Sequence, residues 1–244
     1  MTAALALPGY AIAVAWCAPV ARRRGRLIAD KPGMDLPAGA IGWLPVGREE
    51  LVRRRSAAEW VTYLLEPKNW IIVTTLAVGW HADGGAGLAW GAVAALFAAV
   101  LPMAFINRGI RHGRWNDRNV GAKRPRLIVL SFLIASVAVG LALLVGFGAP
   151  GELSGYVGCM LGSVAVLATI TTVWKISIHC AVASGSVTLL ALLFGPWLAP
   201  AYLLVALTGW SRVALKDHTT AQVVTGSLLG AAAAVVTYAI IPHR

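Results

Sequence analysis

Long apolar runs, separated by short polar segments, dominate the chain after Trp60. Most of these runs approach the roughly 20 residues that a helix needs to cross about 30 Å of hydrocarbon. Glu66-Pro67-Lys68 interrupts the first run, so its membrane part is expected to begin only at Asn69. The pattern predicts an all-α fold, a polytopic transmembrane helix bundle of about six or seven core spans. These spans are expected at 61–81, 86–106, 127–149, 153–173, 179–197, 198–211 and 220–241.

The first 60 residues follow a different pattern. Residues 3–20 are apolar, and the cations Arg22, Arg23, Arg24 and Arg26 come after them. A secretory signal carries its positive charges before the apolar core, so this order favours a membrane anchor. The sequence therefore predicts an N-terminal apolar anchor with a basic cytoplasmic segment at 1–60, and a transmembrane helical domain at 61–244.

Composition supports a membrane protein. Hydrophobic residues make up 58% of the chain and charged residues only 13%, about half the share that soluble domains carry. The 21 Lys and Arg exceed the 10 Asp and Glu, but they fall in loops between apolar runs without aromatic interleaving, which argues against nucleic acid as a partner. Cys17, Cys159 and Cys180 lie inside apolar runs without metal-ligand spacing, so neither a disulfide framework nor a zinc site is indicated.

Three polar clusters are expected to face one compartment. Loop 107–126 is two crossings away from Lys175, and His179 is two crossings away from Arg212. By this count 20 of the 21 Lys and Arg share that face, and only Arg244 lies opposite. Because positive residues concentrate in cytoplasmic loops, the protein is expected in the plasma membrane with this face toward the cytoplasm.

The segment around Arg212 and His218 carries candidate chemistry. Gln222 follows His218 by four residues, so on a helix the two side chains share a face and the amide can hydrogen-bond the imidazole. A cation at the end of a short apolar span is costly and needs a reason. The structural alternative is that Arg212 reaches the membrane interface and that His218 caps the next helix.

A second segment, Lys175 to His179, lies one hairpin earlier in the chain. Ser177 and His179 stand at the start of a predicted helix, where backbone N–H groups and the helix dipole favour an anion. Lys175 adds a mobile positive charge. An interfacial lysine and a capping serine would explain this segment alone, but two histidine-containing clusters on one side together indicate a site for a phosphorylated lipid headgroup.

Ser177-x-His179 and Ser211-Arg212-x5-His218 resemble the second and third signature motifs of the type 2 phosphatidic acid phosphatase superfamily, the helical membrane lipid phosphatases related to vanadium haloperoxidases. The resemblance extends over roughly residues 61–241. It implies that His218 attacks phosphorus and forms a phospho-histidine, that His179 protonates the leaving oxygen, and that Arg212 holds the phosphoryl oxygens. Lys175 and Ser177 would add phosphate contacts, and the scheme uses no metal or other cofactor.

The chain departs from these motifs at several positions. Ile176 and Ile178 replace the usual Pro and Gly of the second motif, and Gln222 replaces the Asp that orients the nucleophile. An Asp fixes the tautomer and stabilises the imidazolium, whereas a Gln does only the first, which leaves Asp217 or Asp117 as an additional orienting group.

The first motif, Lys-x6-Arg-Pro in the family, is approximate here. The segment from Asp117 to Arg126 matches it in part. Arg124-Pro125 supplies the Arg-Pro, but Asp117 stands where the motif has its Lys, seven residues before Arg124. Arg118 together with Arg124 or Arg126 is expected to bind phosphate, while a basic loop that only orients the chain explains the same residues.

The leading hypothesis from the sequence is a lipid phosphatase that hydrolyses a prenyl or polyprenyl diphosphate or phosphatidic acid. A second hypothesis keeps the phosphate pocket but uses a prenyl diphosphate for prenyl transfer or cyclisation, because Gln222 replaces the orienting Asp. A non-catalytic lipid-phosphate-binding role is the third. In each case the expected partners are a phosphorylated lipid and the bilayer.

Overall fold

A computed structural model describes residues 46–114 and 123–242 of the chain. The chain divides into two units, Met1–Glu49 and Glu50–Arg244, and the bundle treated below belongs to the second. The predicted anchor at 3–20 and the predicted site residue Arg118 lie outside the described residues, as does Asp117. The predicted domain boundary, between 60 and 61, falls inside the first described helix, α3 (Val46–Leu64).

Every element in the described part of the chain is a helix; the helices after α3 follow the predicted apolar runs, whereas α3 lies mostly in the polar segment before them. They begin and end within a few residues of the expected positions, except that the second run continues to Arg111. After α3 they are α4 (Pro67–Ala95), the π-helix η2 (Leu96–Val100), α5 (Leu101–Arg111), α6 (Lys123–Gly146), α7 (Gly151–Val173), α8 (Ile178–Phe194), the 3₁₀-helix η3 (Pro196–Ala201), α9 (Tyr202–Ala214) and α10 (Thr220–Ile240).

Four helical stretches among the described residues are long and apolar enough to cross a membrane. They are Arg55–Arg111, Arg124–Gly146, Gly151–Val173 and Thr220–Ile240, and α8 is a shorter apolar helix. The all-helical class is therefore confirmed for this part of the chain, whereas the count of six or seven spans stays a prediction.

Helix α4 contains a reversal of direction. The backbone leaves helical geometry at Asp83 and Gly84, where Gly84 has a φ of 53° that only glycine adopts without strain. The two arms then pack so closely that a Cβ on Gly79 would lie 2.2 Å from the carbonyl oxygen of Gly87. The turn predicted between the first two apolar runs is therefore a tight hairpin of two helical arms.

The core joins helices that are far apart in sequence. Val78 of α4, Val137 of α6, Leu153 of α7 and Leu189 of α8 belong to one buried cluster. Large apolar side chains also cover the outside of the bundle, and three of them are about 70% exposed: Phe147 73%, Leu203 69% and Leu228 66%. An apolar core inside an apolar surface is the arrangement expected for helices packed within lipid.

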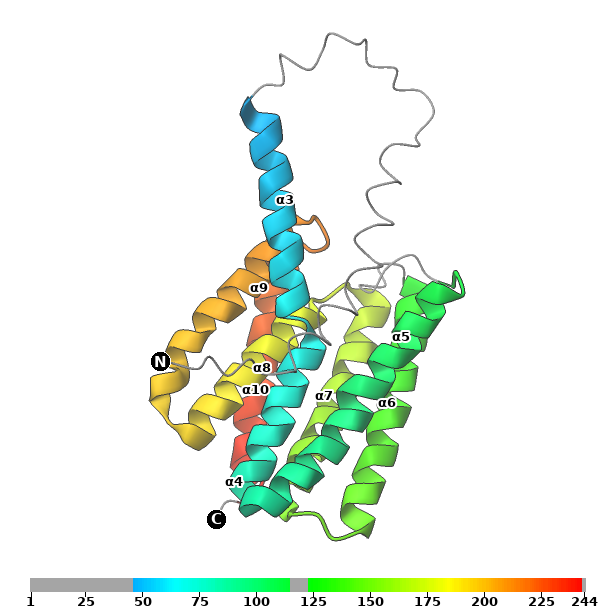
Figure 1. Ribbon diagram of the computed structural model, residues 1–244, viewed down its shortest axis with the longest axis vertical. Helices are drawn as coiled ribbons and strands as arrows, with labels where there is room; N and C mark the ends of the chain where they lie inside the picture. Colours follow the sequence, from blue (N-terminus) through cyan, green and yellow to red (C-terminus); the bar gives the residue numbers. More distant parts are fainter. Residues whose placement is uncertain (1–45, 115–122, 243–244) are drawn as a thin grey trace, which may run out of the picture. The chain divides into compact units, whose positions relative to one another are not determined.

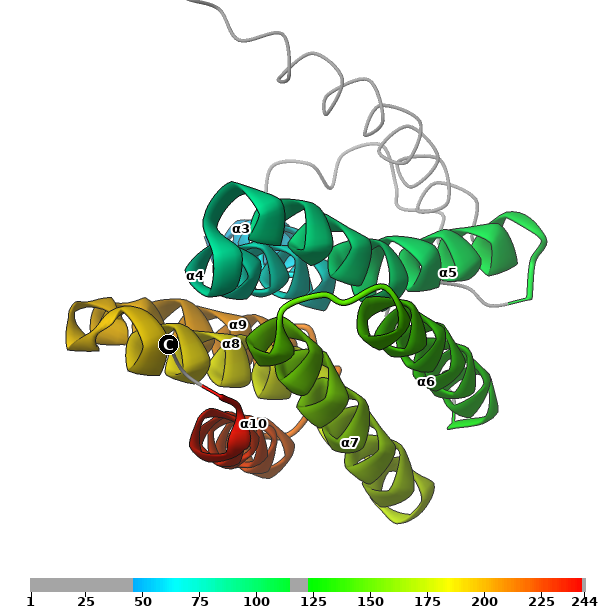
Figure 2. The ribbon, with the colours of Figure 1, turned by 90° about the horizontal axis from the view of Figure 1, so that it is seen from below.

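The two ends of the bundle carry different connections. In Figure 1 the loops before α8 and α10 lie at the upper end, together with the end of α5 and the start of α6. The reversal in α4, the α6–α7 loop and the end of α10 lie at the lower end (Figures 1 and 2). The polar clusters on the described residues therefore gather at one end of the bundle, as the crossing count predicts.

Candidate active site

His179 lies in the first turn of α8, where the local sequence starts the helix. Ser177 is the N-cap residue, and its hydroxyl oxygen accepts a hydrogen bond from the backbone N–H of Cys180 at 3.5 Å. This cap satisfies one of the otherwise unpaired N–H groups of the first turn. Ser177 is completely buried. Its hydroxyl stabilises the helix that carries His179.

The end of α9 fixes the spacing between Arg212 and His218. The carbonyl oxygen of Arg212 accepts hydrogen bonds from the backbone N–H groups of Asp217 at 3.1 Å and His218 at 3.2 Å. Lys216, with a φ of 58°, makes the left-handed turn that this closure requires. Arg212 and His218 are therefore held together by backbone geometry, whatever their side chains do.

Two hydrogen bonds join the loop before α8 to the loop before α10. The backbone N–H of Ser177 donates to the carbonyl oxygen of Gln222 at 3.3 Å. The ammonium of Lys175 donates to the carbonyl oxygen of Asp217 at 2.6 Å. The two histidine-bearing segments that the sequence separates by a helical hairpin are thus tied to each other.

Gln222 orients the ring of His218. Its Oε1 lies 3.1 Å from Nδ1 of His218 and also accepts from the backbone N–H of Thr219 at 3.2 Å, as part of a capping box. A backbone N–H can only donate, so the amide oxygen of Gln222 faces both groups and Nδ1 of His218 must carry the proton. Nε2 is then left with its lone pair.

Burial and neighbouring cations keep His218 neutral. The pKa of His218 is lowered from 6.5 to about 4, mainly by burial and secondly by the guanidinium of Arg212. Lys175 and Arg126 act in the same direction, while the hydrogen bond to Gln222 opposes them. His218 is 8% exposed and Arg212 is 1% exposed. The imidazole is therefore neutral at neutral pH, with its one proton on Nδ1, and it lies among cations.

Arg212 is itself oriented by a carboxylate. Its Nη2 lies 2.8 Å from Oδ2 of Asp217. The hydroxyl of Thr62 on α3 donates to that of Ser211 at 3.0 Å, next to Arg212 in the chain. Asp217 was predicted to orient His218, and the group that its carboxylate binds in the structure is Arg212.

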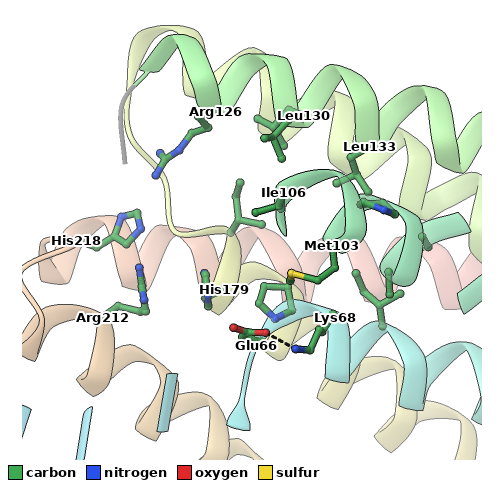
Figure 3. A pocket seen from close by; sticks show the side chains of 17 residues that line it. Glu66, Lys68, Met103, Ile106, Arg126, Leu130, Leu133, His179, Arg212 and His218 are labelled. Carbon is green, nitrogen blue, oxygen red and sulfur yellow. Dashed lines mark ion pairs between the residues drawn. The ribbon is translucent and has the colours of Figure 1, made fainter. Parts of the chain in front are cut away.

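A pocket opens in front of these groups (Figure 3). At one end Arg126, His179, Arg212 and His218 line it. The rest is mostly apolar and comes from α4, η2, α5, α6 and α8: Pro67, Ile71, Ala98, Ala99, Pro102, Met103, Ile106, Val129, Leu130, Leu133 and Ile178. Its cavity volume is about 150 Å³, several times the roughly 30 Å³ that a water molecule occupies in the liquid.

The predicted site residues divide into three groups. His218, His179, Arg212 and Arg126 line the pocket. Lys175, Ser177, Asp217 and Gln222 stand behind it and hold the loops and the side chains that face it. Arg124 is exposed and does not line the pocket, so of the alternatives Arg124 and Arg126 the structure brings the second to the histidines.

Two charged residues that line the pocket were not predicted as site residues. Glu66 and Lys68, at the start of α4, face the same pocket, although the sequence pattern marked them only as an interruption of an apolar run. A signal was present, because Pro67 between them is typical of the first position of a helix. That position places the triplet at the end of the bundle where the other polar clusters lie.

Fold and site together define a class: a helical membrane protein in which two histidines and two arginines open onto a largely apolar pocket. A family model described as the PAP2 superfamily matches residues 165–244, which include α8, α9 and α10 with both histidines. This match confirms the resemblance to the type 2 phosphatidic acid phosphatases and supports a phosphatase-type, lipid-related function. Searches of curated proteins and of solved structures found no match.

Proposed function

We propose that this protein is a membrane lipid phosphatase that hydrolyses a phosphate ester on a lipid. One observation carries the proposal: a single pocket has two histidines and two arginines at one end and mostly apolar side chains along the rest. The polar end suits a phosphate group, and the apolar part suits the lipid chain attached to it.

His218 is the nucleophile in this proposal. Its Nδ1 is occupied by the hydrogen bond to Gln222, and its neutral Nε2 has a lone pair available for attack on phosphorus. The nearby positive charges of Arg212 and Arg126 draw the phosphate toward this atom. They also stabilise the negative charge on the phosphoryl oxygens as the phosphorus–oxygen bond breaks.

His179 is the general acid. In the first step, with His179 in its imidazolium form, a bond forms between Nε2 of His218 and phosphorus, the bond from phosphorus to the lipid oxygen breaks, and His179 gives one proton to that oxygen. In the second step water attacks phosphorus, its proton passes to His179, and the nitrogen–phosphorus bond breaks. The products are the lipid alcohol and inorganic phosphate, and both imidazoles return to their starting state.

We further propose that the site faces the cytoplasm. By the crossing count, 20 of the 21 Lys and Arg lie on the face that carries the site, and positive residues concentrate on the cytoplasmic side. Substrates made inside the cell would then reach the pocket from the inner leaflet.

The experiment is phosphate release by the purified full-length protein in the presence of EDTA, with phosphatidic acid and prenyl phosphates as substrates. Wild type is expected to release phosphate and to form an acid-labile phosphoenzyme. His218→Ala is expected to lose both, by at least about a thousandfold, because the nucleophile is gone. His112→Ala, at an exposed histidine outside the pocket, is the matched control and should behave like wild type.

Two results would contradict the proposal. Equal phosphate release by wild type and His218→Ala would remove the nucleophile from the mechanism. A requirement for Mg²⁺ together with a transferred or cyclised prenyl product would favour the prenyl diphosphate chemistry instead.

A further inference from the structure

Glu66 and Lys68 form a second charged group in the pocket, outside the region matched to the superfamily. Oε2 of Glu66 lies 2.6 Å from Nζ of Lys68, with side chains 8% and 24% exposed. The ammonium of Lys68 also lies 5.3 Å from the ring centre of Tyr63. The pair is therefore fixed in place and largely removed from water.

Its position relates it to the leaving group. In Figure 3 His179 is drawn between His218 and the Glu66–Lys68 pair, and Met103 and Ile106 are drawn above the pair, on the side of Leu130 and Leu133. A lipid phosphate attacked by His218 and protonated by His179 would direct its leaving oxygen toward this pair, with its chain among the neighbouring apolar residues. The pair is thus placed to contact whatever group is bonded to the phosphorus on the lipid side.

The charges of the described lining residues suit one phosphate. Arg126, Arg212 and Lys68 are positive and Glu66 is negative, which leaves two positive charges before His179 takes up the proton that it donates. Directly behind them stand one negative charge, on Asp217 paired with Arg212, and one positive charge, on Lys175, so these two leave the sum unchanged. A phosphate monoester carries about two negative charges near neutral pH. A lipid diphosphate would carry more and would bring its second phosphate against the carboxylate of Glu66.

We infer that Glu66, paired with Lys68, makes the pocket select lipid phosphate monoesters over lipid diphosphates. The inference rests on the proposed phosphatase function and deepens it. Lys68 is neutralised by Glu66 and cannot offer its full charge to a second phosphate. Because like charges interact strongly in a partly dry pocket, the carboxylate is expected to lower the relative efficiency on a diphosphate by roughly tenfold or more.

The test compares farnesyl phosphate with farnesyl diphosphate, which share one lipid chain, and measures kcat/KM for phosphate release. Wild type should favour the monophosphate. Glu66→Gln removes the carboxylate and frees the charge of Lys68, so the monophosphate-to-diphosphate ratio should fall about tenfold. Lys68→Gln removes the ammonium and keeps the carboxylate of Glu66, so the ratio should rise. The two variants therefore shift the selectivity in opposite directions, which a general loss of folding would not produce.

Glu59→Gln is the matched control. Glu59 lies on α3, is 46% exposed, and pairs with Arg55 at 3.5 Å, outside the pocket. The monophosphate-to-diphosphate ratio of this variant should equal that of wild type. The inference would be overturned if wild type released phosphate but preferred the diphosphate, or if neither pocket variant changed the ratio. If wild type released no phosphate from either farnesyl substrate or from phosphatidic acid, the proposed function itself would fail.

Discussion

The pair of His218 and Gln222 is the point at which this chain departs most from the motif that it resembles. An amide oxygen holds the imidazole in one tautomer, with the proton on Nδ1, as a carboxylate would. An amide does not, however, stabilise the positive charge that appears on the ring when Nε2 bonds to phosphorus. In the proposed mechanism the geometry of the nucleophile is therefore complete, and its electrostatic support is weaker.

Gln222→Glu is expected to raise the rate of phosphoenzyme formation. Glutamate has the same reach as glutamine, so a carboxylate oxygen takes the place of Oε1 and keeps the capping box with Thr219. The added negative charge should speed the step by about tenfold, since each pKa unit of stabilisation is worth about 1.4 kcal/mol. Rapid-quench measurement of the phosphoenzyme tests this. Gln222→Leu neither hydrogen-bonds the imidazole nor carries a charge, so it should be slower than wild type.

The protonation of His218 gives a second prediction. With a pKa lowered to about 4, the imidazole stays neutral and nucleophilic as the pH falls through 6, and loses this form only as the pH falls through about 4. Gln222→Glu should move that midpoint upward, because a carboxylate favours the imidazolium. NMR titration of labelled histidine, assigned with His218→Ala, measures the midpoint directly. Because no substrate is present, the second ionisation of a phosphate ester near about pH 6 does not contribute to the titration. A wild-type midpoint at or above 6.5 would contradict the prediction.

At the scale of elements, the contact between α8 and α10 sets the distance between the two histidines. A Cβ on Gly230 would lie 2.0 Å from the carbonyl oxygen of Ala181, and one on Gly226 would lie 2.6 Å from that of Ser177. Only glycine permits such an approach. Gly226 and Gly230, four residues apart, therefore form a packing surface inside the bundle.

Gly230→Ala is expected to push α10 away from α8 and to lower both stability and activity. Overpacking of this kind costs about 1–3 kcal/mol, and the shift would also separate His218 from His179. Thermal unfolding in detergent and phosphate release test the two effects. Gly162→Ala on α7, where an added Cβ meets nothing within 4 Å, is the matched control and should unfold no earlier than wild type. Unchanged unfolding of Gly230→Ala would refute this role of the close contact.

At the scale of the whole molecule, the proposed orientation is open to direct test. His112 is exposed at the end of the bundle that holds the site, and Phe147 is 73% exposed at the other end. In intact cells an impermeant maleimide should label Phe147→Cys. It should label His112→Cys only after permeabilisation, with the unsubstituted chain as background. The reverse pattern would place the site outside the cell.

The sequence by itself determined the helical class, the approximate bounds of the helices and the gathering of the polar clusters at one end. These features depend on local patterns: apolar runs of membrane length, caps such as Ser177, and the four-residue spacing of His218 and Gln222. Each depends on neighbours along the chain, and for that reason each can be predicted from the sequence.

Only the tertiary structure decided which polar groups meet. Arg124 and Arg126 are about 200° apart around a helix, so only one faces the pocket, and packing of α6 selects Arg126. Ser177 and Asp217 turn to the backbone of α8 and to Arg212, while Glu66 and Lys68 enter from a helix some 110 residues away from His179. Contacts between distant segments depend on how whole helices pack, and no local pattern encodes that choice.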